Sequence, residues 1–165
     1  MADTELKRMV DDVCDTLERL TAGTGLPEGL GAIAKQEMGM FMMYLAASDG
    51  EISQEEADLI SETCDLDLTV ESVAEYIDDN DLYSEAFEQK EPVSLKVMVA
   101  ADNVLYQSGQ SISGSEALIE TYRALGIGLI TADDVVTGNE EQDLNIYINM
   151  MTEYRNKNYK GAKNV

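Results

Sequence analysis

The stretch Met38–Glu62 constrains the fold most, because it predicts two helices joined by a tight turn. Met40–Ala47 is almost wholly apolar, so the first of these helices is expected to be buried on most sides. Gly50 can take the left-handed conformation at which helices commonly end. Ser53 and Glu56 have the spacing of a capping box, which predicts that the second helix begins directly after Ser53.

Apolar residues recur at helical spacing along most of the chain, and no segment alternates convincingly at the two-residue period of a strand. The pattern predicts helices over about residues 4–20, 31–48, 53–64, 70–78, 82–89 and 93–109. A second capping box, Ser113 with Glu116, opens a helix that is expected to break at Gly126-Ile127-Gly128. A short helix then opens at Thr131, and a last one begins near Asn139, ahead of a frayed basic tail.

The chain also contains a degenerate internal repeat. Ile52-Ser53-x-x-Glu56-Ala57 matches Ile112-Ser113-x-x-Glu116-Ala117, 60 residues later. Each copy follows an apolar helix that contains an Ala-Ala pair. We therefore expect an all-α fold: one domain over 1–165, a compact bundle of about seven to eight helices built from two related helix-turn-helix halves. Its core would span about 30–150, preceded by a helix over 4–20 and followed by a basic tail over 155–165.

A formal net charge of −22 limits the partners that the chain can bind. Contacts to phosphates require Lys and Arg, so neither nucleic acid nor an anionic membrane is an expected partner. Between Glu51 and Glu91 there are 15 acidic residues and one base. Such a run is commonly a solvated surface, but it can also bind a basic protein. The residues predicted to form a surface of this kind are Glu55, Asp58, Glu62, Asp65 and Asp67.

Several classes of function and location find little support in the sequence. There is no His, which rules out a His-based catalytic triad, and we expect a protein that is not an enzyme. A carboxylate-based enzyme that cleaves phosphodiesters or glycosides is the remaining catalytic alternative. Two cysteines without a spacing pattern, and no apolar run of membrane-spanning length or secretory signal, predict a cytoplasmic protein with free thiols.

The turn after the apolar helix resembles that of the TerB-like family, which is named for tellurite-resistance proteins. Its pattern, A-x-x-D-G-x-I-x-x-x-E, is matched by Ala46, Asp49, Gly50, Ile52 and Glu56. The resemblance covers about residues 30–150, and the second half departs from it, because Asn103 stands where a second D-G would place its Gly. It implies a helical bundle of two related halves and a cytoplasmic, non-enzymatic protein linked to stress response or phage defence.

The resemblance also implies that acidic residues bind cations. The candidate ligands for Ca²⁺ or Mg²⁺ are Asp49, Glu51 and Glu56, with Asp102 from the second half. Alternatively, Asp49 accepts hydrogen bonds from its own turn, and Glu56 only completes the helix cap. Two functions follow: a TerB-like protein that binds a divalent cation, or an acidic inhibitor or immunity-type protein that neutralises a basic partner such as a nuclease.

Overall fold

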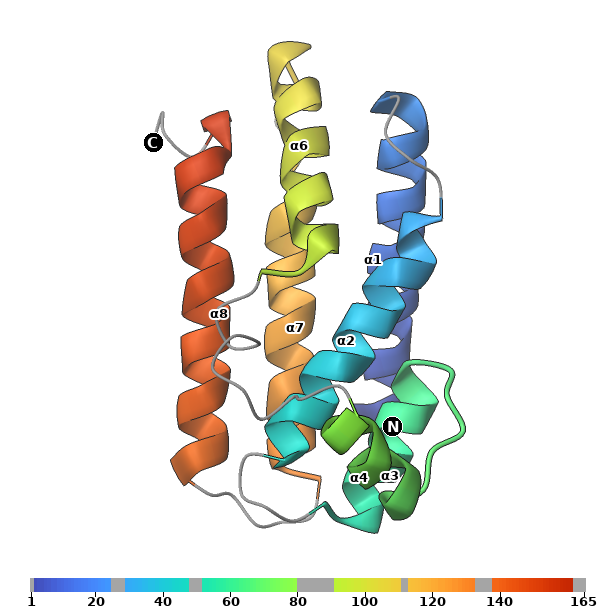
Figure 1. Ribbon diagram of the computed structural model, residues 1–165. Coiled ribbons are helices and arrows are strands. Elements are labelled where there is room, and N and C mark those ends of the chain that lie inside the picture. The colour runs from blue at the N-terminus through green and yellow to red at the C-terminus, as the bar shows by residue number, and fades with distance from the viewer. Residues whose placement is uncertain are drawn as a thin grey trace.

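A computed structural model describes residues 2–24, 29–47, 52–79, 91–110, 113–132 and 138–161, and these contain seven helices and no strand (Figure 1). The all-α prediction is therefore confirmed. The helices are α1 (Ala2–Thr24), α2 (Leu30–Ala47), α3 (Gln54–Thr63), α4 (Val70–Asp79), α6 (Val93–Gln107), α7 (Gly114–Ile130) and α8 (Gly138–Asn158). Within these ranges, no helix is both long enough and apolar enough to span a membrane.

Helix α7 lies at the centre of the bundle, where it packs against α1, α2, α6 and α8. Figure 1 shows α8 at the left, beside α6 and α7, which overlap in this view. Helix α2 crosses in front of the lower end of α7, and α1 lies at the right. The short helices α3 and α4 pack together beside α2 at one end of the bundle. Each long helix thus buries one face on its neighbours and leaves another face exposed.

Aromatic and methionine side chains fill the centre of the core. The Phe41 ring on α2 lies 5.0 Å from the Tyr122 ring on α7 and 4.7 Å from the Tyr147 ring on α8, measured between centroids. Met42, Met43 and Met151 are buried, and Met40 and Met150 pack partly against the same core. These methionines therefore belong to the core or pack directly against it.

Two predicted helix starts are confirmed by their hydrogen bonds. The Ser53 hydroxyl accepts the Glu56 backbone N–H at 3.1 Å, and the Glu56 carboxylate accepts the Ser53 N–H at 2.9 Å, which completes the capping box of α3. At α4, the Thr69 hydroxyl accepts the Ser72 N–H at 3.2 Å. Local spacing is enough to place these two ends, because every partner lies within one turn.

The predicted break at Gly126-Ile127-Gly128 is wrong, since α7 continues to Ile130. A Cβ at Gly126 would overlap the Leu144 side chain of α8, and one at Gly128 would lie 2.6 Å from a methyl of Leu6 on α1. These glycines let neighbouring helices approach closely, and the packing that results offsets the intrinsic cost of Gly in a helix.

Two further predictions need correction. The Ser113 hydroxyl accepts the Glu116 N–H at 3.3 Å, but no return bond forms, and the Glu116 carboxylate lies 3.8 Å from Arg155 instead. The predicted fraying of the basic tail is wrong for the residues up to Gly161, which pack against the bundle. Tyr159 is buried, and the Lys160 N–H donates to the Asn103 side chain at 2.8 Å. The helix predicted over 82–89 lies outside the described residues, as does the short one after Thr131, except for its first two positions.

Candidate functional site

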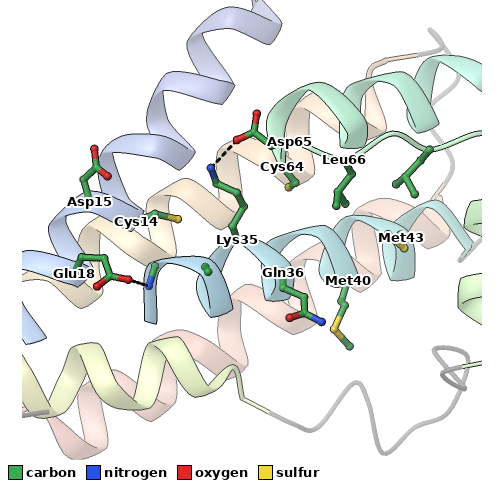
Figure 2. Close-up of a pocket in the computed structure, with 13 residues that line it drawn as sticks. Cys14, Asp15, Glu18, Lys35, Gln36, Met40, Met43, Cys64, Asp65 and Leu66 are labelled. Carbon is green, nitrogen blue, oxygen red and sulfur yellow. Dashed lines mark hydrogen bonds and ion pairs between the residues drawn. The ribbon is translucent and has the colours of Figure 1, made fainter. Parts of the chain in front are cut away.

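A cavity of about 720 Å³, here called the α1–α2 pocket, lies between α1, α2 and the segment that follows α3 (Figure 2). The end of α3 shapes one wall. Asp65 takes a left-handed conformation with φ of 56°, and the Leu66 N–H donates back to the Ser61 carbonyl at 2.9 Å. This bond pattern ends the helix and reverses the chain direction, which places Leu66 and Leu68 in the wall of the pocket.

A chain of ion pairs runs along the same side of the pocket. The Lys35 ammonium lies 2.8 Å from Asp65 and 3.0 Å from Asp11, and Lys7 lies 2.6 Å from the other oxygen of Asp65. Hydrogen bonds from Lys35 and Lys7 lower the pKa of Asp65 to about 2. The hydrogen bonds of Lys35 to Asp65 and Asp11 raise the pKa of Lys35 well above its ordinary value. The positive charge of Lys35 is therefore neutralised by two carboxylates.

Two free thiols also line the pocket, Cys14 from α1 and Cys64 from the end of α3. Burial raises the pKa of both thiols to about 11. Because the nucleophile in cysteine chemistry is the thiolate, these neutral thiols are suited to packing, not to catalysis. No thiol-based reaction is supported at this site.

The two ends of the pocket differ in chemistry. Asp15 and Glu18 lie at the α1 end, whereas Met40, Met43 and Leu66 lie toward the opposite end (Figure 2). One oxygen of Glu18 accepts the Gly31 N–H at 2.8 Å, which also fixes the first turn of α2 against α1. The pocket is therefore polarised along its length, with carboxylates at one end and apolar side chains at the other.

Three of the five acidic residues predicted to bind a partner come together on the structure. Glu55, Asp58 and Glu62 are exposed along one side of α3, the α3 acidic face, and they border a second cavity of about 380 Å³. Leu6 and Leu59 supply apolar side chains to this cavity. Asp67 is exposed after the helix, and Asp65 faces Lys7 and Lys35 instead of joining this group.

The predicted cation ligands are not assembled in the described part of the chain. Asp49 and Glu51 lie outside it, and the buried Glu56 completes the cap of α3. Asp102 is fully buried, and its oxygens accept the Gly114 N–H at 2.8 Å, the Ser115 N–H at 2.9 Å and the Ser115 hydroxyl at 2.6 Å. Among the described residues, no three His, Cys, Asp or Glu side chains are grouped to hold a metal ion.

The surroundings of Asp102 show a structural centre that the sequence did not indicate. The Arg155 guanidinium donates to the Ser115 hydroxyl at 3.0 Å and to the Ser113 hydroxyl at 2.8 Å, and it lies 5.0 Å from the centre of the Tyr159 ring. These contacts join α6, the start of α7 and the end of α8. Their partners are far apart in sequence, so no local spacing could have predicted them.

Comparison with known proteins found no matching protein family, no matching curated protein and no matching solved structure.

Proposed function

We propose that this chain is a non-enzymatic binding protein that engages a basic protein partner through the α3 acidic face. The observation that carries this proposal is the grouping of Glu55, Asp58 and Glu62 on one side of α3, next to a cavity with apolar side chains. The TerB-like resemblance is in keeping with a binding function, since it implies a helical protein without catalysis.

The negative charge of the α3 acidic face is available to a partner. None of the described basic side chains forms an ion pair with these three carboxylates, whereas Lys7, Lys35, Arg123 and Arg155 pair with other acids. Carboxylates without ion-pair partners create a negative potential over the face. Such a potential speeds encounter with a positively charged surface and selects against acidic competitors.

The cavity beside these carboxylates indicates how a partner could be held. Leu6 and Leu59 line this cavity although both belong mainly to the core, and the three acids stand along its edge. A basic amphipathic helix matches this arrangement, because it presents apolar side chains flanked by Lys or Arg. An inhibitor or immunity-type protein acting on a basic enzyme such as a nuclease would use a surface of this kind.

Binding to a model partner tests the proposal directly. The probe is a synthetic helical peptide with Leu on one face and Lys on the other, titrated calorimetrically at low and high salt. We expect salt-sensitive binding that the triple variant Glu55→Gln/Asp58→Asn/Glu62→Gln weakens about tenfold, the sum of three exposed charge pairs.

The matched control changes the net charge by the same amount at exposed sites on α1 and α8, through Asp12→Asn/Glu141→Gln/Glu153→Gln. It should retain most of the affinity. If both triple variants weaken binding equally, overall charge accounts for the interaction and the α3 acidic face has no special part. Absence of peptide binding to the wild type would also reject the proposal.

Divalent-cation binding is a separate prediction that depends on Asp49 and Glu51 together with Glu56. Calorimetric titration with calcium and magnesium tests it. Heat of binding that disappears in Asp49→Asn would support a cation site at the first turn. No heat in the wild type would reject it, and that result would leave the peptide experiment unaffected.

A further inference from the structure

The α1–α2 pocket lies beside α1 and α2 and is bordered by a set of residues separate from that of the α3 acidic face. Its volume of about 720 Å³ is in the range of sites that hold small organic molecules. Three segments form its walls, and each is fixed by its own contacts: the Glu18 bond to Gly31, the ion pairs of Lys35 and the chain reversal at Asp65. The pocket is therefore part of the folded bundle and does not depend on the proposed function.

The apolar part of the pocket selects for a hydrocarbon group. Met40, Met43 and Leu66 lie along one stretch of it (Figure 2), and Leu66 is 41% exposed although it is a large apolar side chain. The neutral thiols of Cys14 and Cys64 extend this surface without adding charge. A ligand that covered Leu66 and the partly exposed Met40 would remove apolar surface from water, which favours binding.

The charges around the pocket select for a cation. Lys35 is the one base among the lining residues, and Asp11 and Asp65 neutralise it. An anionic ligand would have to displace a carboxylate from Lys35. Asp15 at the α1 end adds further negative charge, because no described base forms an ion pair with it. The balance of charge at this end is therefore negative.

We propose that the α1–α2 pocket binds a small organic cation that carries an apolar chain, such as a primary alkylammonium ion. The ammonium group lies at the α1 end beside Asp15 and Glu18. The hydrocarbon chain lies along Met40, Met43 and Leu66. The charge at one end of the pocket and the apolar surface at the other together fix the orientation of the bound ligand.

Three probes with the same eight-carbon chain test the two requirements separately. Octylammonium, octanoate and 1-octanol are titrated into the protein while backbone amide signals of α1 and α2 are followed by NMR. We expect octylammonium to bind most tightly and octanoate least tightly, with shifts that centre on residues bordering the pocket. Equal affinity for all three probes, or shifts that centre elsewhere, would overturn the proposal.

Matched variants then test the two ends. Asp15→Asn should weaken octylammonium binding about two- to fivefold, the usual size of one exposed ion pair, and leave octanol binding unchanged. Asp12→Asn, an exposed acid on the same helix but outside the pocket lining, should change neither. Equal weakening by Asp15→Asn and Asp12→Asn would show a general charge effect and refute the assignment.

At the apolar end, Leu66→Ser should weaken both octylammonium and octanol binding. Ile127→Ser, at an exposed position on α7 outside the pocket lining, is its control. The triple variant of the α3 acidic face should bind octylammonium like the wild type. If that variant loses octylammonium binding while Asp15→Asn keeps it, the ligand occupies the α3 surface and the proposal for this pocket is wrong.

Discussion

The carboxylate of Asp102 holds the first turn of α7, so its removal is expected to destabilise the bundle. It accepts the backbone N–H groups of Gly114 and Ser115 and the Ser115 hydroxyl, and all of these groups are buried. Each buried donor left unsatisfied costs about 1–3 kcal/mol. Because the Ser115 hydroxyl can rotate toward another acceptor, we count the two backbone donors and expect Asp102→Ala to lower the free energy of unfolding by about 3 kcal/mol.

Asp102→Asn separates the loss of charge from the loss of acceptors. The amide oxygen can still accept one backbone N–H, and the amide nitrogen can donate to the Ser115 hydroxyl. We therefore expect a smaller loss, of about 1–2 kcal/mol. Asp58→Ala removes an exposed carboxylate from α3 and serves as the control, with an expected change within about 0.5 kcal/mol.

Urea denaturation followed by far-ultraviolet circular dichroism measures these differences, with an unchanged dependence on urea as the check that the unfolded states are comparable. A loss below about 1 kcal/mol in Asp102→Ala would refute the role assigned to this carboxylate. If calcium or magnesium stabilised the wild type and not Asp102→Asn, Asp102 would instead be a cation ligand, because a ligand stabilises the state that binds it.

Three other predictions follow from packing and charge. Gly126→Ala should destabilise the protein by about 1–3 kcal/mol, because the added methyl would overlap the Leu144 side chain. In a double-mutant cycle measured by urea unfolding, Leu144→Ala should relieve part of that cost. Additive effects of the two substitutions would contradict the overlap. Lys35 and Lys7 lower the pKa of Asp65 to about 2 from 3.8. These two ion pairs therefore stabilise the fold at pH values above 3.8, and their contribution is lost as the pH falls from 3.8 toward 2. Asp65→Asn should flatten the pH dependence of the unfolding midpoint between these two pH values. The thiols of Cys14 and Cys64 should react with iodoacetamide slowly in the native state at neutral pH and rapidly in urea, since burial raises their pKa to about 11. Fast labelling of the native protein would contradict the burial of these two thiols.

Features that depend on neighbours within one helical turn could be predicted from the sequence. The capping box at Ser53 and the cap at Thr69 have all their partners within three residues, and the structure has both. Features that depend on another helix could not. A Gly-x-Gly spacing predicts a helix end on local grounds, yet Gly126 and Gly128 are accommodated because Leu144 and Leu6 fill the space beside them.

The candidate site divides in the same way. Exposure of Glu55, Asp58 and Glu62 follows from their spacing on α3, so their grouping could be predicted. Asp65 is only three residues past Glu62, but the left-handed turn at Asp65 directs its carboxylate to Lys7 and Lys35. The α1–α2 pocket combines segments from three parts of the chain, and no sequence pattern links them.

The high negative charge of this chain is used in two physically different ways. Glu37 of α2 accepts the N–H groups of Val93 and Ser94 at the start of α6, at 2.6 and 2.9 Å, and Asp102 of α6 does the same at the start of α7. Carboxylates at helix N-termini are stabilised by the helix dipole and satisfy backbone donors that have no partner within the helix. Acids of this kind stabilise the packing of one helix on another, whereas Asp15 and the α3 acidic face make no such bond to another helix among the described residues. Neutralising the first group should therefore reduce stability, while neutralising the second should alter binding in a protein that still folds.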